Sequence, residues 1–206
     1  MKRNLSKGVY NLMMASGTSF ATTLFFFFFG ISAGVFTELM MDSGEKENIR
    51  SYLDKYFLLS DLDNVTFQDI FFTSAGNNLG FLIIIILSGL TAIGFPVVLA
   101  TLIYKGMALG FSAALLIDSM SHKGVALVLT SMLPQNLIFI PVLILGGVVA
   151  LNLAFYTFSN RRSGIKKSLR ESSGPYFTIN LILAIAIIVG CFVESAISPL
   201  LTQLIV

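Results

Sequence analysis

The sequence predicts an all-α fold: a polytopic integral membrane helical bundle of about five transmembrane helices, two of them kinked or broken by proline. Of the 206 residues, 55% are hydrophobic and only 12% are charged. About a quarter of the residues in a soluble domain are charged, so a soluble chain of this length could not bury so much apolar surface. Several apolar runs also exceed the roughly 18 residues that mark a membrane span. We therefore expect one membrane domain over residues 1–206.

Residues 18–41 form the first predicted span, after a basic cytoplasmic N-terminus at residues 1–17. A basic flank followed by an apolar core also describes a signal peptide, and the small residues at 31–34 would suit cleavage. The apolar core is longer than that of a signal peptide, however, and further spans follow it. We therefore expect an uncleaved first helix.

The polar, acidic segment 42–75 is predicted to be extracytoplasmic and amphipathic. Its apolar residues recur at helical spacing and define one face; they are Ile49, Tyr52, Leu53, Tyr56 and Phe57. A second short helix is expected to start at Thr66, whose spacing from Asp69 suits a capping box, and to present Phe67 and Phe71. We hypothesise that this apolar surface docks the extracytoplasmic or transmembrane region of a partner. The alternative is a helix that lies on the outer membrane surface or covers the bundle.

The almost continuously apolar stretch 77–120 is too long for one crossing at about 1.5 Å per residue. Within it, Gly94 and Pro96 are expected to kink the helix, because proline lacks a backbone donor and clashes with the preceding turn.

Lys105 and Gly106 supply a charge and a flexible residue in the same stretch, so we predict a cytoplasmic turn there. The turn would separate a span at 77–103 from one at 107–120. Because the latter is short for a full crossing, it could instead form a re-entrant pair with residues 125–134.

A fourth span at 125–158 is interrupted by Pro134 and Pro141, with Gln135 and Asn136 after the first proline. In hydrocarbon, the backbone groups that proline frees must find partners within the protein. The two amides could satisfy their own helix or bridge to another, at about 1 kcal/mol per bond. We favour this structural interpretation, while a substrate or ion site near the midplane, as in transporters with discontinuous helices, stays open.

The last predicted span, 175–198, follows a basic loop at 159–174. Its Glu194 lies just before Pro199 and would either reach water at the membrane surface or mark a functional site at depth. The positive-inside rule places the basic ends in the cytoplasm and the acidic segment 42–75 outside. The N-terminus is then cytoplasmic and the C-terminus extracytoplasmic.

One histidine and one cysteine cannot build a metal site or an internal disulfide. Motifs of hydrolases, nucleotide-binding proteins and metalloproteases are missing, so we expect no cofactor and no enzymatic activity. No basic patch with interleaved aromatic residues suggests nucleic acid, and membrane lipid is the expected environment. A homo-oligomer through faces of small residues is left open.

Three stretches resemble the stage II sporulation protein M family of endospore-forming bacteria: GFPVVLATLIYKGMALGF, SMLPQNLIFIPVLILGG and VESAISPLL. Their order and spacing agree with the family across nearly the whole chain. The resemblance implies a membrane scaffold that recruits and anchors the peptidoglycan-degrading stage II sporulation proteins D and P. That assembly drives septal wall thinning and engulfment, so the expected location is the cell membrane at the sporulation septum and the engulfing membrane.

Broader relatives of this family carry Pro-His-Gly and a downstream Glu where this chain has Pro134-Gln135-Asn136 and Phe139. An acid–base role therefore does not carry over, which favours the scaffold. The alternative function is a channel or transporter core that uses the broken helices around Pro96 and Pro134–Pro141. An aqueous path should need more polar residues on facing helices than the sequence suggests, and an intramembrane enzyme is a distant third hypothesis.

Overall fold

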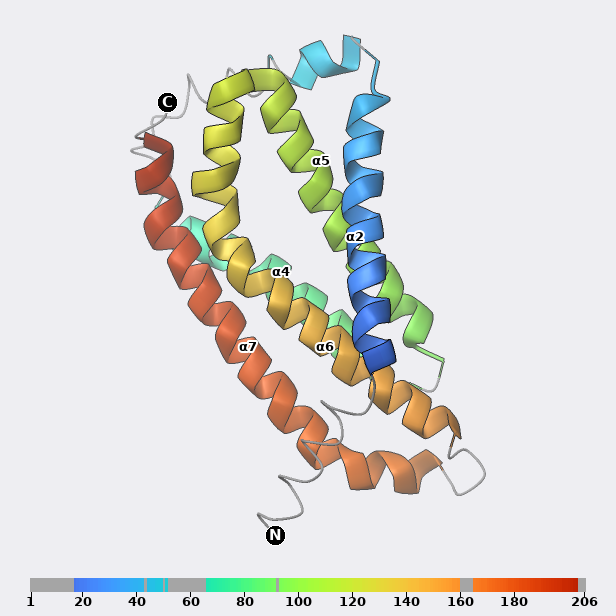
Figure 1. The fold of residues 1–206 in the computed structure, drawn as a ribbon. Coiled ribbons are helices and arrows are strands. Elements are labelled where there is room, and N and C mark those ends of the chain that lie inside the picture. The colour runs from blue at the N-terminus through green and yellow to red at the C-terminus, as the bar shows by residue number, and fades with distance from the viewer. Residues whose placement is uncertain are drawn as a thin grey trace.

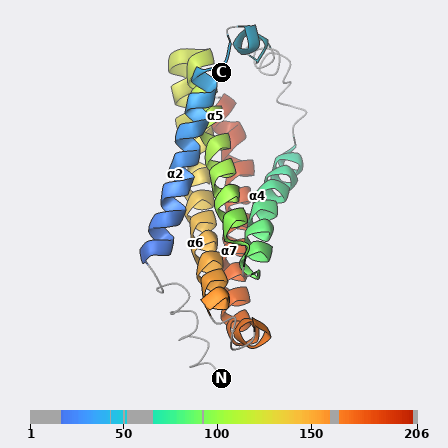
Figure 2. The same ribbon diagram turned by 90° about the vertical axis from the view of Figure 1, so that its right-hand side faces the viewer.

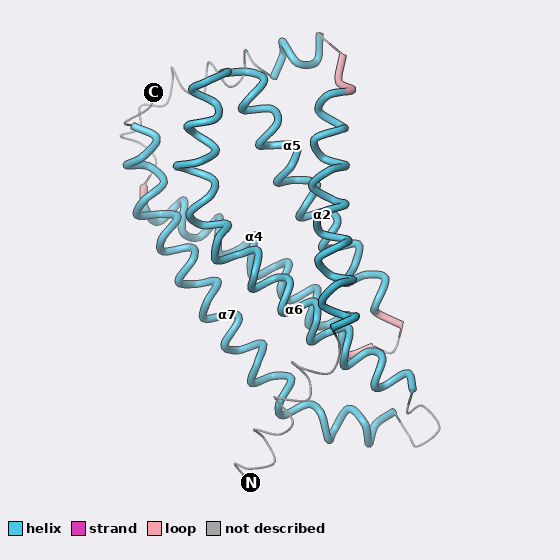
Figure 3. The backbone as a smooth tube through the Cα atoms, viewed as in Figure 1, coloured by secondary structure: helices cyan, strands magenta, loops and turns pink. Residues whose placement is uncertain are grey.

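The computed structural model describes residues 17–42, 44–49, 51, 66–91, 93–159 and 165–203, without the side chains of 165–173 and 197–203. The long elements are α2 (Gly17–Leu39), α4 (Phe67–Gly89), α5 (Phe95–Leu127), α6 (Leu133–Ser159) and α7 (Ile165–Gln203). A short π-helix, η2 (Val128–Met132), joins α5 to α6. In this part of the chain the secondary structure is helical, with short connections (Figure 3).

Four helical stretches of the described chain are long and apolar enough to cross a membrane: Gly17–Leu39, Phe67–Gly89, Phe95–Ser159 and Gly174–Ala196. The third stretch has 65 residues and doubles back on itself (Figure 1). The reversal includes Ser121, which has a positive φ of 50° inside otherwise helical backbone. It makes α5 and α6 two arms of a hairpin, and the predicted polytopic helical membrane bundle is thereby confirmed.

The bundle has two ends, which we name after the residues found there. The Gly17 end holds the start of α2, the α4–α5 connection and the end of α6, whereas the Ser121 end holds the end of α2 and the reversal (Figure 1). The helix α4 begins well below the Ser121 end, so that α5, α6 and α7 extend past it (Figures 1 and 2). The principal partner of α2 is α5, and α4, α6 and α7 pack together.

The predicted turn at Lys105 and Gly106 is wrong, because both residues lie inside α5. The chain turns instead between Gly89 and Phe95. Gly94 is the N-cap of α5 and Pro96 lies in its first turn, where the missing N–H of proline costs no helical hydrogen bond. Pro96 therefore starts a helix and does not kink one.

The boundaries of the neighbouring spans move accordingly. In place of spans at 77–103 and 107–120, α4 covers Phe67–Gly89 and α5 begins at Phe95. The arm from Phe95 to Ser121 is about 40 Å long at 1.5 Å per residue, which is enough for a full crossing. A short re-entrant pair is therefore not formed.

The helix α6 is the central element of the bundle. Most of its side chains between Val142 and Ala154 are buried, and those of α4, α5 and α7 pack around it. Large apolar side chains such as Phe25, Phe28 and Phe29 of α2 are exposed on the outside. An apolar exterior around an apolar core suits a helix bundle whose solvent is lipid.

Two pairs of glycines bring the backbones of α2 and α5 into contact. A Cβ on Gly30 or Gly34 of α2 would overlap the carbonyl oxygen of a residue in α5, and a Cβ on Gly106 or Gly110 of α5 would overlap one in α2. Both pairs have the spacing Gly-x-x-x-Gly, which permits close helix approach in membranes. These glycines are covered inside the chain and are not free to join two copies of it.

Candidate functional site

The helix α4 begins at a capping box and then carries a polar face into the bundle. Thr66 is the N-cap: its Oγ1 accepts from the Asp69 backbone N–H at 3.3 Å, and its own N–H donates to the Asp69 carboxylate at 3.2 Å. The start of a helix at Thr66 is confirmed, although that helix has 23 residues and is not short. Four polar residues follow one and two helical turns after Asp69: Thr73, Ser74, Asn77 and Asn78.

This face borders a polar cavity of about 390 Å³. The side chains around it come from α4, α5 and α7 and include three that are ordinarily charged; its lining consists of Asp69, Ile70, Thr73, Ser74, Asn77, Asn78, Lys105 and Glu194. Polar residues inside a membrane protein are rare and most often mark a functional path or site.

Lys105 enters the cavity from α5 and is held by α4. Its Nζ donates to Asn78 Oδ1 at 2.9 Å and lies 5.2 Å from the centroid of the Phe81 ring. Asn78 is itself buried and donates from Nδ2 to the Ser74 carbonyl oxygen at 3.0 Å. Insertion of a lysine at the centre of a membrane helix costs about 2.5–3.5 kcal/mol, and these partners offset part of that cost. They explain why Lys105 lies inside a helix and not in a turn.

Glu194 enters the cavity from α7 and is half-buried. One carboxylate oxygen accepts from Ser74 Oγ of α4, and the other accepts from Gln135 Nε2 of α6 at 2.9 Å. Ser74 Oγ also lies 3.4 Å from the buried Cys191 Sγ. The carboxylate therefore connects three helices, and α7 continues past Pro199 to Gln203.

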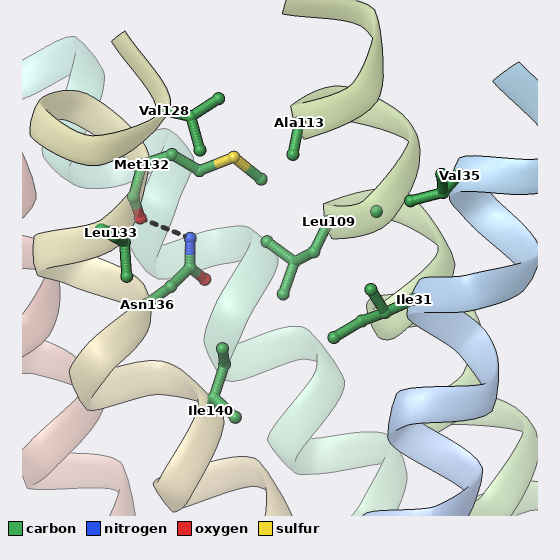
Figure 4. Close-up of a pocket in the computed structure, with 10 residues that line it drawn as sticks. Ile31, Val35, Leu109, Ala113, Val128, Met132, Leu133, Asn136 and Ile140 are labelled. Carbon is green, nitrogen blue, oxygen red and sulfur yellow. Dashed lines mark hydrogen bonds between the residues drawn. The ribbon is translucent and has the colours of Figure 1, made fainter. Parts of the chain in front are cut away.

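The two amides that follow Pro134 face different parts of the bundle. Whereas Gln135 reaches Glu194, Asn136 donates from Nδ2 to the carbonyl oxygen of Met132, the last residue of η2, at 2.7 Å. Asn136 borders a second hollow of about 210 Å³, whose other walls are apolar side chains of α2, α5, η2 and α6 (Figure 4). Pro141 lies inside α6 and is exposed.

A cluster of three charges ties the segment 44–49 to the Ser121 end. Lys46 Nζ lies 2.8 Å from Glu38 Oε1 of α2 and 3.4 Å from Asp118 Oδ2 of α5, and Glu38 is only 1% exposed. The hydrogen bond to the Glu38 carboxylate, with the charge of Asp118, raises the pKa of Lys46 above its usual 10.5. The ammonium charge of Lys46 is therefore still present at pH 10.5, and at alkaline pH the pairing is lost as the pH rises through that higher pKa.

The predicted docking residues are only partly described. Ile49 is half-exposed on the segment held by Lys46, and Tyr52, Leu53, Tyr56 and Phe57 lie outside the described residues. Phe67 stacks on Phe71, with ring centroids 6.1 Å apart, and also meets Phe192 of α7 at 5.5 Å. The aromatic pair at the start of α4 thus packs against α7.

Sequence reasoning missed the groups that hold the charges. Ser74, Asn78 and Phe81 were not singled out, although Ser74 and Asn78 are one turn apart in an otherwise apolar helix. That spacing places them on one helical face and was the available signal. Asp118 and Lys123 of α5 are both exposed, and Asp118 pairs with Lys46.

In a comparison with protein families, the model described as Stage II sporulation protein M matches residues 23–199, most of the chain. No curated protein and no solved structure matches the chain significantly.

Proposed function

Because the chain belongs to the stage II sporulation protein M family, we propose that it is the membrane-embedded scaffold of the sporulation septum. In this role it recruits and anchors the stage II sporulation proteins D and P, which degrade peptidoglycan during septal wall thinning and forespore engulfment. It performs no catalysis itself, and it resides in the septal and engulfing membranes.

The observation that carries this proposal is the anchored segment at the Ser121 end. Lys46 pairs with Glu38 of α2 and Asp118 of α5, which fixes the residues directly before the predicted docking face at 49–57. A docking surface held at a fixed place costs less ordering free energy on binding than a free one. The proposed partner surface therefore follows directly on a segment that is tied to the bundle.

The proposed orientation puts the N-terminus in the cytoplasm and the C-terminus outside. The helix ends that border the basic segments 1–17 and 159–174 lie together at the Gly17 end (Figure 1). The positive-inside rule assigns such an end to the cytoplasm. The anchored segment then faces the compartment that contains peptidoglycan.

Gentle crosslinking in sporulating cells, followed by purification of the tagged protein, tests the scaffold. We expect proteins D and P to co-purify with the wild type and to be lost when Tyr52→Glu and Tyr56→Glu are combined. Ser51→Glu is the matched control, because Ser51 lies on the polar side of the predicted helix. If the double variant reached normal abundance in the membrane and still retained both partners, this face would not be the docking surface.

A second candidate function, a solute channel or transporter core, is favoured by the polar cavity. The cavity is bounded by three helices and includes Lys105 and Glu194. One turn closer to the Gly17 end, however, Leu82 and Leu102 are 1% and 0% exposed and fill the space between helices. Flux measurements on proteoliposomes separate the candidates, since a scaffold produces no flux above that of empty vesicles.

A further inference from the structure

Lys105 and Glu194, two of the three charged side chains of the polar cavity, border the same space without forming an ion pair. Among the described residues, no ion pair joins Lys105 to Glu194. Neutral groups hold both: Asn78 the ammonium group, and Ser74 and Gln135 the carboxylate. Opposite charges inside a membrane protein ordinarily pair with one another. Here room is left between a cation and an anion.

Each charged group also keeps hydrogen-bonding capacity. An ammonium group has three donors, and Lys105 gives one to Asn78 and presents another side to the Phe81 ring. A carboxylate has about four acceptor positions, and Ser74 and Gln135 occupy one on each oxygen of Glu194. The cavity of about 390 Å³ lies within the range of small-molecule sites.

Charge decides which ligand suits the cavity. A simple anion beside Lys105 would also face the carboxylates of Glu194 and Asp69, and a simple cation beside Glu194 would face Lys105. In a low-dielectric site such like-charge neighbours are costly. A molecule with one charge of each sign, placed in the right order, meets an opposite charge at both ends.

We propose that this cavity binds a small zwitterion with an ammonium group and a carboxylate or phosphate a few bonds apart. The ammonium group of the ligand binds Glu194, and its acidic group binds Lys105. Two sources share this chemistry: a free amino acid or short peptide, and the headgroup of phosphatidylethanolamine. The proposal is independent of the scaffold role, because neither partner protein is needed for binding.

The fold also gives the direction of access. The cavity extends from Lys105 within α5 to Asp69 in the first turn of α4, and α4 begins well below the Ser121 end (Figures 1 and 2). Toward the Gly17 end, buried Leu82 and Leu102 close the space. The ligand therefore enters from the side of the Ser121 end.

Calorimetric titration of the purified full-length protein tests the charge requirement. The protein is placed in nanodiscs of phosphatidylcholine and phosphatidylglycerol and titrated with alanine, alanylalanine, alaninamide and N-acetylalanine. We expect alanine or alanylalanine to bind at least about tenfold more tightly than either singly charged analogue, a difference of about 1.4 kcal/mol. A second arm places the protein in nanodiscs of phosphatidylethanolamine, phosphatidylcholine and phosphatidylglycerol in equal amounts and measures bound lipid by native mass spectrometry.

The two arms distinguish the sources. Binding of alanine or alanylalanine identifies a soluble ligand, while selective retention of phosphatidylethanolamine over both other lipids identifies a headgroup; either supports the proposal. Equal binding of alanine and one singly charged analogue would overturn it, as would the failure of every probe and the absence of lipid preference.

Variants assign the binding to the two charged residues. Lys105→Met and Glu194→Gln are each expected to weaken binding about tenfold, whereas Lys123→Met, which removes an exposed lysine, leaves it unchanged. Should a variant not fold, the comparison of analogues on the wild-type protein still decides the question. Unchanged binding by both folded variants would place the ligand elsewhere.

Discussion

Replacement of Gly34 by alanine should weaken the contact between α2 and α5. The new Cβ would overlap the Met107 carbonyl oxygen and lie 2.8 Å from the Phe111 backbone nitrogen. Both are backbone atoms, so no side-chain rotation can relieve the overlap and the helices must move apart. Overpacking of this kind costs about 1–3 kcal/mol.

Helix propensity opposes this cost, because alanine is about 1 kcal/mol more favourable than glycine in a helix. Gly80→Ala provides the matched control: Gly80 lies inside α4, and a Cβ there meets no atom within 4 Å. Both substitutions gain the same helix propensity, so the difference between their unfolding free energies leaves only the cost of the overlap. We therefore expect Gly34→Ala to be less stable than Gly80→Ala by about 1–3 kcal/mol.

The measurement is reversible unfolding of the full chain in mixed micelles of increasing sodium dodecyl sulfate, followed by circular dichroism. Gly106→Ala, whose Cβ would overlap the Phe27 carbonyl oxygen, should behave as Gly34→Ala does. If both variants matched Gly80→Ala in unfolding free energy, the two backbones would not be in contact and the glycine-packed interface would be wrong.

Three further predictions concern the polar contacts and the reversal. Gln135→Leu removes a donor from Glu194 and should cost about 1 kcal/mol in the same unfolding assay, whereas Gln68→Leu, at an exposed position, should cost less. Ser121→Gly should stabilise the protein by about 1 kcal/mol, because a positive φ strains a non-glycine residue. Ser119→Gly inside α5 should destabilise it. Equal effects of the two substitutions on the unfolding free energy would contradict a strained reversal. Lys46→Met should accelerate amide hydrogen exchange over residues 44–49 at neutral pH, where the raised pKa of Lys46 keeps it charged and paired, and Glu47→Gln, an exposed neighbour, should not.

Features set by neighbouring residues could be predicted from the sequence. Apolar run length and the scarcity of charge predict the membrane bundle, because a span is a property of one continuous segment. The capping box at Thr66 and Asp69 is equally local, since its two residues lie in a single helical turn. Both predictions required no knowledge of what packs against the helix.

Features that depend on distant partners could not be predicted. A lysine in an apolar run suggests a turn unless a partner inside the bundle is known. The partner of Lys105 is Asn78, which lies 27 positions away in the sequence. For Glu194 the sequence left open a place at the membrane surface and one at depth, and its partner Ser74, which holds it inside the bundle, lies 120 positions away. The amides after Pro134 were recognised as hydrogen-bonding groups, but only the packing of α6 against α7 shows that Gln135 serves Glu194.

The glycine-packed interface also constrains how the chain is assembled during synthesis. Gly34 and Gly106 are about 70 residues apart, and ribosomes add roughly 5–20 residues per second. For several seconds, then, α2 resides in the bilayer before the helix that it packs against has been made. Its exposed phenylalanines, among them Phe25 and Phe29, keep the helix soluble in lipid during this time, while its glycine face is still uncovered. Assembly then proceeds as docking of preinserted helices, in which α2 can pack against α5 before α6 and α7 have been made.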